Sequence, residues 1–313
     1  MTITVNAYMK GIPPGNKNPE KPKLLEYFIQ GVNKTGDQGI IVRNFHHYPS
    51  DVALLQGFVH PQSKHVPHLN LRREVLENQT ANRKRTIIAD ANLFLYADPG
   101  NTKTYLRYSY DGIFPSTAEY CWDPVDRNRW DQISKDLGLT LKPWKKVSDG
   151  GNILICCQRD GGWSMEGTGI IQWLHPLILR IRRNTDRPIV VRFHPGDKKQ
   201  RDHYKKISRI PYKNVTISDP NKPLMSELKD AYCMINHNSS PAVAAAIEGV
   251  PIFVLDSKNS QAADVAHTDV RDIENLRTFD REPWIRKISM SHWRLDELRS
   301  GRAWRHMRQW ANK

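Results

Sequence analysis

Residues 236–255 read NHNSSPAVAAAIEGVPIFVL, and this stretch decides the fold of the chain. An apolar run at residues 232–235 precedes it and predicts a buried strand. The small side chains of residues 242–249 predict a helix that ends at its glycine. A second strand is expected at residues 250–255, so the stretch predicts a strand–helix–strand unit of an α/β fold.

Two serines, Ser239 and Ser240, stand where this helix is expected to begin. Hydroxyl and backbone N–H groups at a helix N-terminus suit a phosphate. Another apolar run, at residues 188–192, predicts a parallel strand that is followed by His194. Because open α/β sheets bind ligands at the carboxyl ends of their strands, we expect His194 and the serines to face one crevice. A serine that only caps the helix and a structural His194 are the alternatives.

The paired His-Pro and Ser-Ser motifs, with the small-residue helix and the Gly-x-Pro strand, resemble nucleotide-sugar glycosyltransferases of the GT-B type. The pattern is most similar to the subset that includes bacterial polysialyltransferases and capsule sugar transferases, and it covers residues 150–260. The resemblance implies an α/β fold with two Rossmann-like domains facing a central cleft, and C-terminal helices that pack back toward the N-terminal domain. It also implies a nucleotide sugar such as a UDP-sugar as co-substrate, with no further cofactor.

The resemblance gives roles to individual residues. His194 would contact the phosphate or ribose of the donor, Ser239 and Ser240 would hold the phosphate, and Asn238 would shape the turn. Since glycosyl transfer expels a nucleotide phosphate, hydrogen-bond donors fixed at this place would stabilise the leaving group without a metal.

The alternation of strands and helices predicts three parts. Residues 1–148 form an acceptor-side α/β domain, residues 149–280 form the nucleotide-sugar-binding domain, and residues 281–313 form a helical segment. The Trp-, Lys- and Pro-rich residues 123–150 are the expected hinge.

A Gly-Gly turn follows the first strand of the second domain. Gly161 and Gly162 let the backbone approach a diphosphate closely, and we expect Arg159 and Trp163 to line the site, with Trp163 as a stacking surface. A simple tight turn is the alternative.

An inverting transfer needs a base for the acceptor hydroxyl. In GT-B enzymes this base usually comes from the N-terminal domain, where the candidates are Asp37, Asp90, Asp98 and Asp111. We favour Asp111 as the catalytic base beside His194, because the Asp-Gly pair follows a strand; a turn-forming aspartate is the alternative.

The formal net charge of +14 favours a polyanionic partner or an acidic membrane surface. We expect the acceptor to be hydroxymethylated pyrimidine bases in phage DNA, which must be flipped out of the duplex. A transferase for lipopolysaccharide or capsule sugars at the cytoplasmic membrane face is one alternative, and a non-catalytic nucleic-acid-binding protein is another. The expected phosphate contacts of DNA are Lys198, Lys199, Arg201, Arg302 and Arg305.

The four cysteines show no metal-ligand spacing, and no Asp-x-Asp pair ends a strand, so no metal site is expected. The sequence shows neither a signal peptide nor an apolar run long enough to span a membrane. These features predict a reduced, cytoplasmic protein, located in the host cytoplasm if it is viral.

Overall fold

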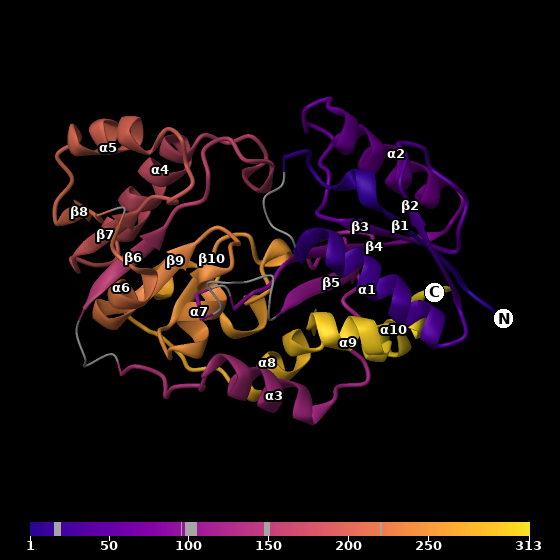
Figure 1. Ribbon diagram of the computed structural model, residues 1–313. Helices are drawn as coiled ribbons and strands as arrows, with labels where there is room; N and C mark the ends of the chain where they lie inside the picture. Colours follow the sequence, from indigo (N-terminus) through magenta and orange to yellow (C-terminus); the bar gives the residue numbers. More distant parts are fainter. Residues whose placement is uncertain (16–19, 95, 98–104, 147–150, 220) are drawn as a thin grey trace. The chain divides into compact units, whose positions relative to one another are not determined.

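The computed structural model describes residues 1–15, 20–94, 96–97, 105–146, 151–219 and 221–313 (Figure 1). The chain forms two compact units, each an α/β structure built around its own sheet. Unit 1 comprises Met1–Gln132 and Arg286–Lys313, and unit 2 comprises Ile133–Ile285.

Unit 1 contains, among the described residues, a six-stranded sheet in the order β11-β5-β4-β3-β1-β2. Its strands are β1 (Thr4–Tyr8), β2 (Gln38–Val42), β3 (Val52–Gln56), β4 (Arg85–Ala91), β5 (Leu106–Tyr110) and β11 (His292–Trp293). The first four are mutually parallel, whereas β5 runs antiparallel to both β4 and β11. The carboxyl ends of β1 to β4 therefore lie at one edge of the sheet, and β5 ends at the opposite edge.

Helices cover this sheet because their apolar residues recur at helical spacing. They are α1 (Glu20–Lys34), α2 (Pro67–Ala81), α9 (Leu295–Ser300) and α10 (Arg302–Met307). Two further helices, α3 (Arg127–Leu137) and α8 (Glu282–Ser289), each contain a division between the two units. The C-terminal segment packs on unit 1, as expected, and α9 lies against α1 (Figure 1). Their approach is close, since a Cβ atom at Gly31 would stand 2.0 Å from the Leu298 carbonyl oxygen. The C-terminal segment, which was expected to be helical, also contains the short strand β11.

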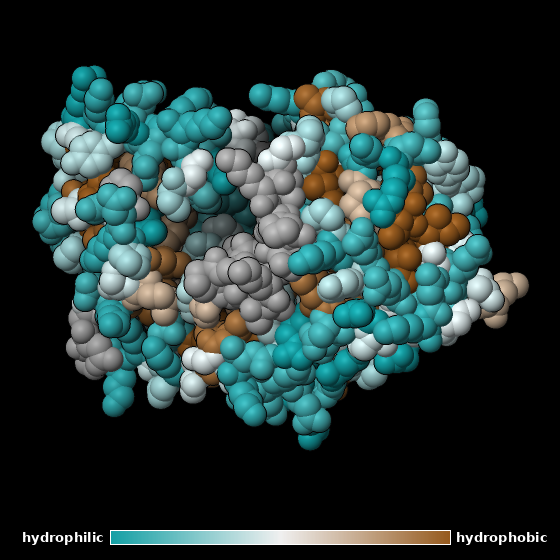
Figure 2. All heavy atoms as spheres, in the orientation of Figure 1, coloured by the Kyte–Doolittle hydropathy of each residue, from teal (hydrophilic) through white to brown (hydrophobic). Residues whose placement is uncertain are grey.

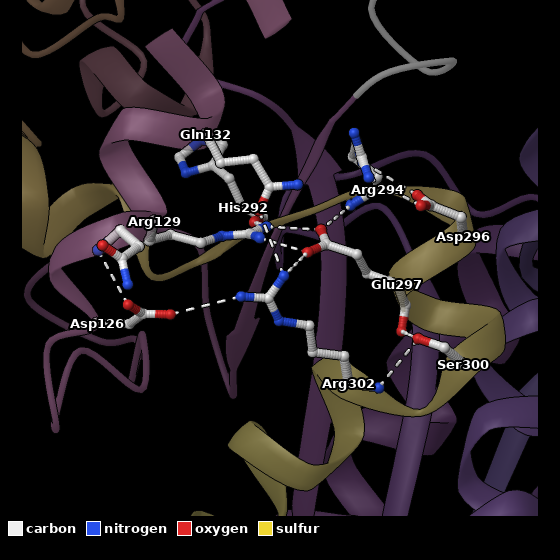
Figure 3. A network of polar contacts seen from close by, with 10 residues as sticks. Asp126, Arg129, Gln132, His292, Arg294, Asp296, Glu297, Ser300 and Arg302 are labelled. Carbon is white, nitrogen blue, oxygen red and sulfur yellow. Dashed lines mark hydrogen bonds and ion pairs between the residues drawn. The ribbon is translucent and has the colours of Figure 1, made fainter. Parts of the chain in front are cut away.

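A buried ion-pair network fastens the C-terminal segment to unit 1 (Figure 3). Arg129 of α3 is fully buried and donates two hydrogen bonds to Glu297 of α9, over 2.5 and 2.8 Å. Arg302 donates to the same carboxylate over 3.0 Å and contacts Asp126. The guanidinium of Arg129 also lies 4.2 Å from the ring centroid of Trp293. Since every charge here has an opposite partner, the network tolerates burial.

Unit 2 is built, within the described residues, on a five-stranded parallel sheet in the order β10-β9-β6-β7-β8. The strands are β6 (Asn152–Cys156), β7 (Ile189–Arg192), β8 (Val215–Ile217), β9 (Ala231–Asn236) and β10 (Ile252–Val254). The helices are α4 (Ile170–Arg182), α5 (Gln200–Ser208), α6 (Leu224–Asp230) and α7 (Pro241–Ile247). Residues 236–255 thus contain α7 and β10, as expected.

The division between the units falls at Gln132 and Ile133, earlier than the boundary at residue 148 that composition suggested. Residues 142–145 already belong to unit 2, because Lys142 and Lys145 donate backbone hydrogen bonds to the carbonyls of Ile247 and Gly249. The last boundary also shifts, to Ile285 and Arg286 within α8, rather than residue 280.

All four cysteines are free and buried, as expected. None of the helices in the described ranges is both long and apolar enough to cross a bilayer.

Candidate active site

The strand order of unit 2 reverses direction at the carboxyl ends of β6 and β9, which is the point where open α/β sheets bind ligands. The chain leaves β6 toward β7 on one side, while β9 pairs with β6 on the other, so the connections diverge at this point. Two loops meet here. The Asn238 N–H donates to Oε1 of Gln158 over 3.3 Å, and Gln158 Nε2 donates to Ser164 Oγ over 2.8 Å. Gln158 is a residue that we did not single out from the sequence, although it directly follows the β6 strand.

His194 lies at the end of β7 with one ring nitrogen already engaged. Its Nδ1 accepts a hydrogen bond from the Gly196 N–H over 2.9 Å. Burial lowers the pKa of His194, and the charge of Arg159 lowers it further. The imidazole is therefore neutral at pH 7, and the bond at Nδ1 assigns its proton to Nε2, which is left to act as a donor.

Arg159 lies beside this imidazole. A Cβ atom at Gly196 would stand 2.8 Å from Nη2 of Arg159 and 3.2 Å from Cε1 of His194. In the part of the chain that the structure describes, no hydrogen bond or ion pair engages the Arg159 guanidinium, and the residue is exposed. The structure therefore brings together two of the predicted donor-binding side chains and leaves both with free N–H groups.

Two aspartates hold the loops that carry this pair. The backbone N–H of Asp160 donates to Asp197 Oδ2 over 3.0 Å, which joins the β6 loop to the β7 loop. Asp160 in turn accepts hydrogen bonds from Lys199 Nζ and from the Ile170 N–H, and both lower its pKa. Buried His203 lies 3.4 Å from Asp197 through Nε2. These anchors fix Arg159 and His194 relative to each other.

The turn between β9 and α7 is organised by neighbouring amides. Asn236 Nδ2 donates to the carbonyl and hydroxyl oxygens of Ser239 over 2.7 and 3.0 Å. Ser240 occupies the N-cap position of α7 but makes no side-chain capping bond there. Within the described residues, no hydrogen bond or ion pair joins His194 to Ser239 or Ser240. The serines lie at the expected strand end, with no direct link to the imidazole.

Asp256, after β10, was not identified from the sequence, although it too follows a strand at this edge. Its Oδ2 accepts hydrogen bonds from Asn238 Nδ2 and Asn259 Nδ2, both over 2.8 Å. The same oxygen lies 3.8 Å from Nε2 of His237, whose pKa is lowered by burial. Asp256 therefore holds Asn238 from the side opposite Gln158.

The Gly-Gly turn forms as predicted. The Gly162 N–H donates to the Arg159 carbonyl over 3.3 Å, and Gly161 has a φ of 58°, which favours glycine. The side chain of Trp163 lies outside the described part of the structure.

The three candidate bases that the structure describes lie at different edges of the unit 1 sheet. Asp111, with a φ of 63°, follows β5 at the amino-terminal edge of the parallel strands, where it pairs with Arg85 and accepts from the Thr86 N–H. Asp37 lies at that same edge. Asp90 lies near the carboxyl end of β4, where Arg107 Nη2 donates to its Oδ2 over 2.7 Å. Asp98 lies outside the described residues.

The expected DNA contacts divide into paired and unpaired cations. Lys199 pairs with Asp160, and Arg302 pairs with Glu297 and Asp126. The described residues provide no carboxylate partner for Lys198, Arg201 or Arg305, all of which are exposed. Arg201 lies on α5, over which the surface is largely hydrophilic (Figure 2).

As regards metals, no group of three or more His, Cys, Asp or Glu side chains in the described ranges is placed to hold an ion.

No protein-family model matches the sequence, and a search of curated proteins finds no similar sequence. Solved structures do share the fold. Thermosulfurimonas dismutans KpsC, described as a β-Kdo 2,4 transferase, aligns with a TM-score of 0.57 at 10% identity, over 93% of this chain and 92% of that one. A second structure from the same organism, KpsC as a β-Kdo 2,7 transferase, gives a TM-score of 0.53 at 12% identity, over 92% and 91%. The fold is therefore that of GT-B glycosyltransferases.

Proposed function

We propose that the protein is a glycosyltransferase that moves a sugar from a nucleotide sugar to a hydroxyl group, and that the crevice of unit 2 holds the phosphate of the donor. The pairing of Arg159 with His194 carries this proposal. An unpaired guanidinium and an imidazole Nε2–H face the same space at the carboxyl ends of β6 and β7. Arginine suits phosphate oxygens because its N–H groups form a planar fork.

The chemistry follows from these donors. The acceptor oxygen forms a bond to the anomeric carbon, the bond from that carbon to the phosphate oxygen breaks, and the electron pair leaves with the nucleotide. Negative charge grows on the phosphate in the transition state, where Arg159 and His194 donate hydrogen bonds to it. Asn238, fixed by Gln158 and Asp256, holds the turn that presents Ser239 and Ser240 to the same edge. In this scheme Arg159 offsets the negative charge and the neutral imidazole of His194 donates a hydrogen bond, so we expect transfer to continue in the presence of EDTA.

The acceptor proton needs a base, and we assign this role to Asp90 in preference to Asp111. Asp90 lies at the carboxyl edge of its sheet, Arg107 fixes one of its oxygens, and its Oδ1 makes no hydrogen bond within the described residues. Asp111 is engaged with Arg85 and the Thr86 N–H at the other edge.

A saccharide is the acceptor that we favour. Two solved structures that align with TM-scores of 0.57 and 0.53 are described as Kdo transferases, which supports the capsule-sugar alternative. Hydroxymethylated DNA is the second candidate, supported by the net charge of +14 and by unpaired Lys198 and Arg201.

Thermal unfolding with UDP, CMP, GDP and UMP tests the donor site. A nucleotide at about a hundred times its Kd should stabilise the protein by about 2.7 kcal/mol. If none of the four raises the Tm, the proposal loses its basis. Mass spectrometry after incubation with sugar nucleotides and either a saccharide or hydroxymethylated DNA then identifies the acceptor.

A further inference from the structure

Unit 1 has a cavity of its own, apart from the crevice of unit 2. Its volume is about 510 Å³, within the usual range of small-molecule sites. The lining comes from the segment after β1, from Pro22 of α1, and from the segment after β2 and the first residues of α2. The segments after β1 and β2 follow the carboxyl ends of their strands, where α/β sheets bind ligands.

The cavity is positively charged. Lys10, Arg43 and His68 are its ionisable lining residues, and none of the described lining residues is acidic. Lys10 has no ion pair within the described ranges. Arg43 contacts Glu26 over 3.4 Å, but both side chains are well exposed, so this pair is weak. An anion in the cavity would therefore meet Lys10, which has no ion pair in the described ranges, and Arg43, whose only carboxylate partner there is the exposed Glu26.

The start of α2 adds to the positive field. This helix has fifteen residues, and its N-cap, Val66, offers no side-chain acceptor. Pro67 and His68 of its first turn line the cavity. Nδ1 of His68 is buried and has no hydrogen-bond partner among the described residues. The positive end of the helix thus borders the cavity that Lys10 and Arg43 also line.

A buried arginine on the next turn of α2 contributes a further charge. Arg72 is 6% exposed and donates to the carbonyls of Gly11 and Phe58 over 2.8 and 3.1 Å. No carboxylate hydrogen-bonds to it in the described part of the chain. Carbonyl oxygens accept these N–H groups, and the nearby carboxylate of Asp90 offsets part of the charge of Arg72.

The other walls are apolar and flat. Phe45 is 45% exposed, and the Lys10 Nζ atom lies 5.7 Å from its ring centroid. The lining also includes four prolines, Pro13, Pro14, Pro22 and Pro67, together with Met9, Ile12 and Gly15. Such walls suit the C–H face of a sugar ring, and they offer few partners for the polar edges of a nucleobase.

We propose that this cavity binds an acidic sugar, with its carboxylate or phosphate held by Lys10, Arg43 and the start of α2 and its ring against Phe45. If the protein is a glycosyltransferase as proposed, this site would make its acceptor an anionic saccharide. The binding of an acidic sugar to the cavity does not depend on the proposed function.

Isothermal titration calorimetry on the full chain tests the site with glucuronic acid, glucose 6-phosphate and neutral glucose as probes. Binding of either acid, with no detectable binding of glucose, is the expected result, and comparison of the two acids identifies the preferred anion. The Lys10→Gln/Arg43→Gln variant should weaken binding at least tenfold, and Phe45→Ala should also weaken it. Glu26→Gln, which leaves Arg43 unshared, should tighten it.

Lys64→Gln is the matched control, since Lys64 is an exposed lysine near α2 that does not line the cavity. It should leave the affinity unchanged. Equal binding of glucose and the acids, unchanged affinity in the double variant, or no binding of either acid would overturn the proposal. So would a duplex DNA or UMP that occupies the site in preference to both acids. Nucleotide binding by unit 2 is measured on the same variants: its absence in the unaltered protein would refute the proposed function alone.

Discussion

Arg159 and His194 both approach the α-carbon of Gly196, so closely that a Cβ atom added there would contact both side chains. A Cβ atom at Gly196 would stand 2.8 Å from Arg159 Nη2, closer than such contacts allow. Gly196→Ala should therefore displace the guanidinium, because the end of an arginine moves more easily than the backbone. We expect about tenfold weaker nucleotide binding with a Tm close to that of the unaltered protein. Unchanged affinity would show that the guanidinium does not bind the nucleotide.

The ionisation of His194 depends on its neighbour. Burial and the charge of Arg159 both lower the pKa of His194. Arg159→Met removes the second cause, so the pKa should rise, and nuclear magnetic resonance titration of the imidazole measures this. The same variant should bind nucleotide ten- to a hundredfold more weakly, whereas Arg209→Met, at the end of α5, should not. An unaltered titration of His194 would contradict the close approach of the two side chains.

Asp90 and Asp111 lie at opposite edges of the unit 1 sheet, and replacing each by asparagine should have different effects on kcat and stability. Asp90→Asn should lower kcat by a factor of about 10² to 10⁴ and leave nucleotide affinity intact. Asp111→Asn should mainly lower stability, since it weakens the pair with Arg85 while asparagine tolerates the positive φ. A normal kcat in Asp90→Asn, with a large loss in Asp111→Asn, would return the base to Asp111.

Asp37 links the C-terminal segment to the start of β1. Burial opposes its ionisation, but hydrogen bonds from Arg308, the Ile3 N–H and Trp304 prevail and lower the pKa of Asp37 to about 2. A depressed pKa stabilises the fold above the unfolded value near 4, and this contribution disappears as the pH falls toward 2. Asp37→Asn should cost about 2 kcal/mol at pH 7, with the difference vanishing near pH 2 in urea unfolding. A difference independent of pH would refute this origin.

Arg129 and Glu297 are both buried, so the loss of one leaves the other charge unpaired. Arg129→Met should destabilise the protein by about 3–5 kcal/mol in denaturant unfolding. Arg129→Met/Glu297→Gln should lose less, because no buried charge is stranded. A single variant within about 1 kcal/mol of the unaltered protein would show that the network contributes little.

Local patterns predicted the strands that flank the candidate site, because apolar periodicity records which faces are buried. The packing of the C-terminal helices was expected from the family resemblance alone. Residues 236–255 formed the expected turn, helix and strand. The direction of β5 was not predictable, and it decides where Asp111 lies, because the antiparallel strand ends at the far edge of the sheet.

The sequence predicted that Arg159 and His194 each follow a parallel strand. That the two side chains lie close together was seen only in the structure. The roles of Gln158 and Asp256 needed the structure, since each acts on Asn238 from a different strand end. Likewise, the sequence showed Arg302 and Lys199 as free cations, whereas their carboxylate partners come from distant segments.

Calorimetric titration of UDP, CMP, GDP and UMP in EDTA, on the unaltered protein and on Arg159→Met and His194→Ala, tests the phosphate site most directly. We predict that at least one nucleotide binds with 1:1 stoichiometry and that each substitution weakens it about tenfold or more while the fold remains intact. Nucleotide affinity that stays unchanged in both the Arg159→Met and the His194→Ala variant would contradict the assignment of this site. So would the failure of every nucleotide to bind the unaltered protein.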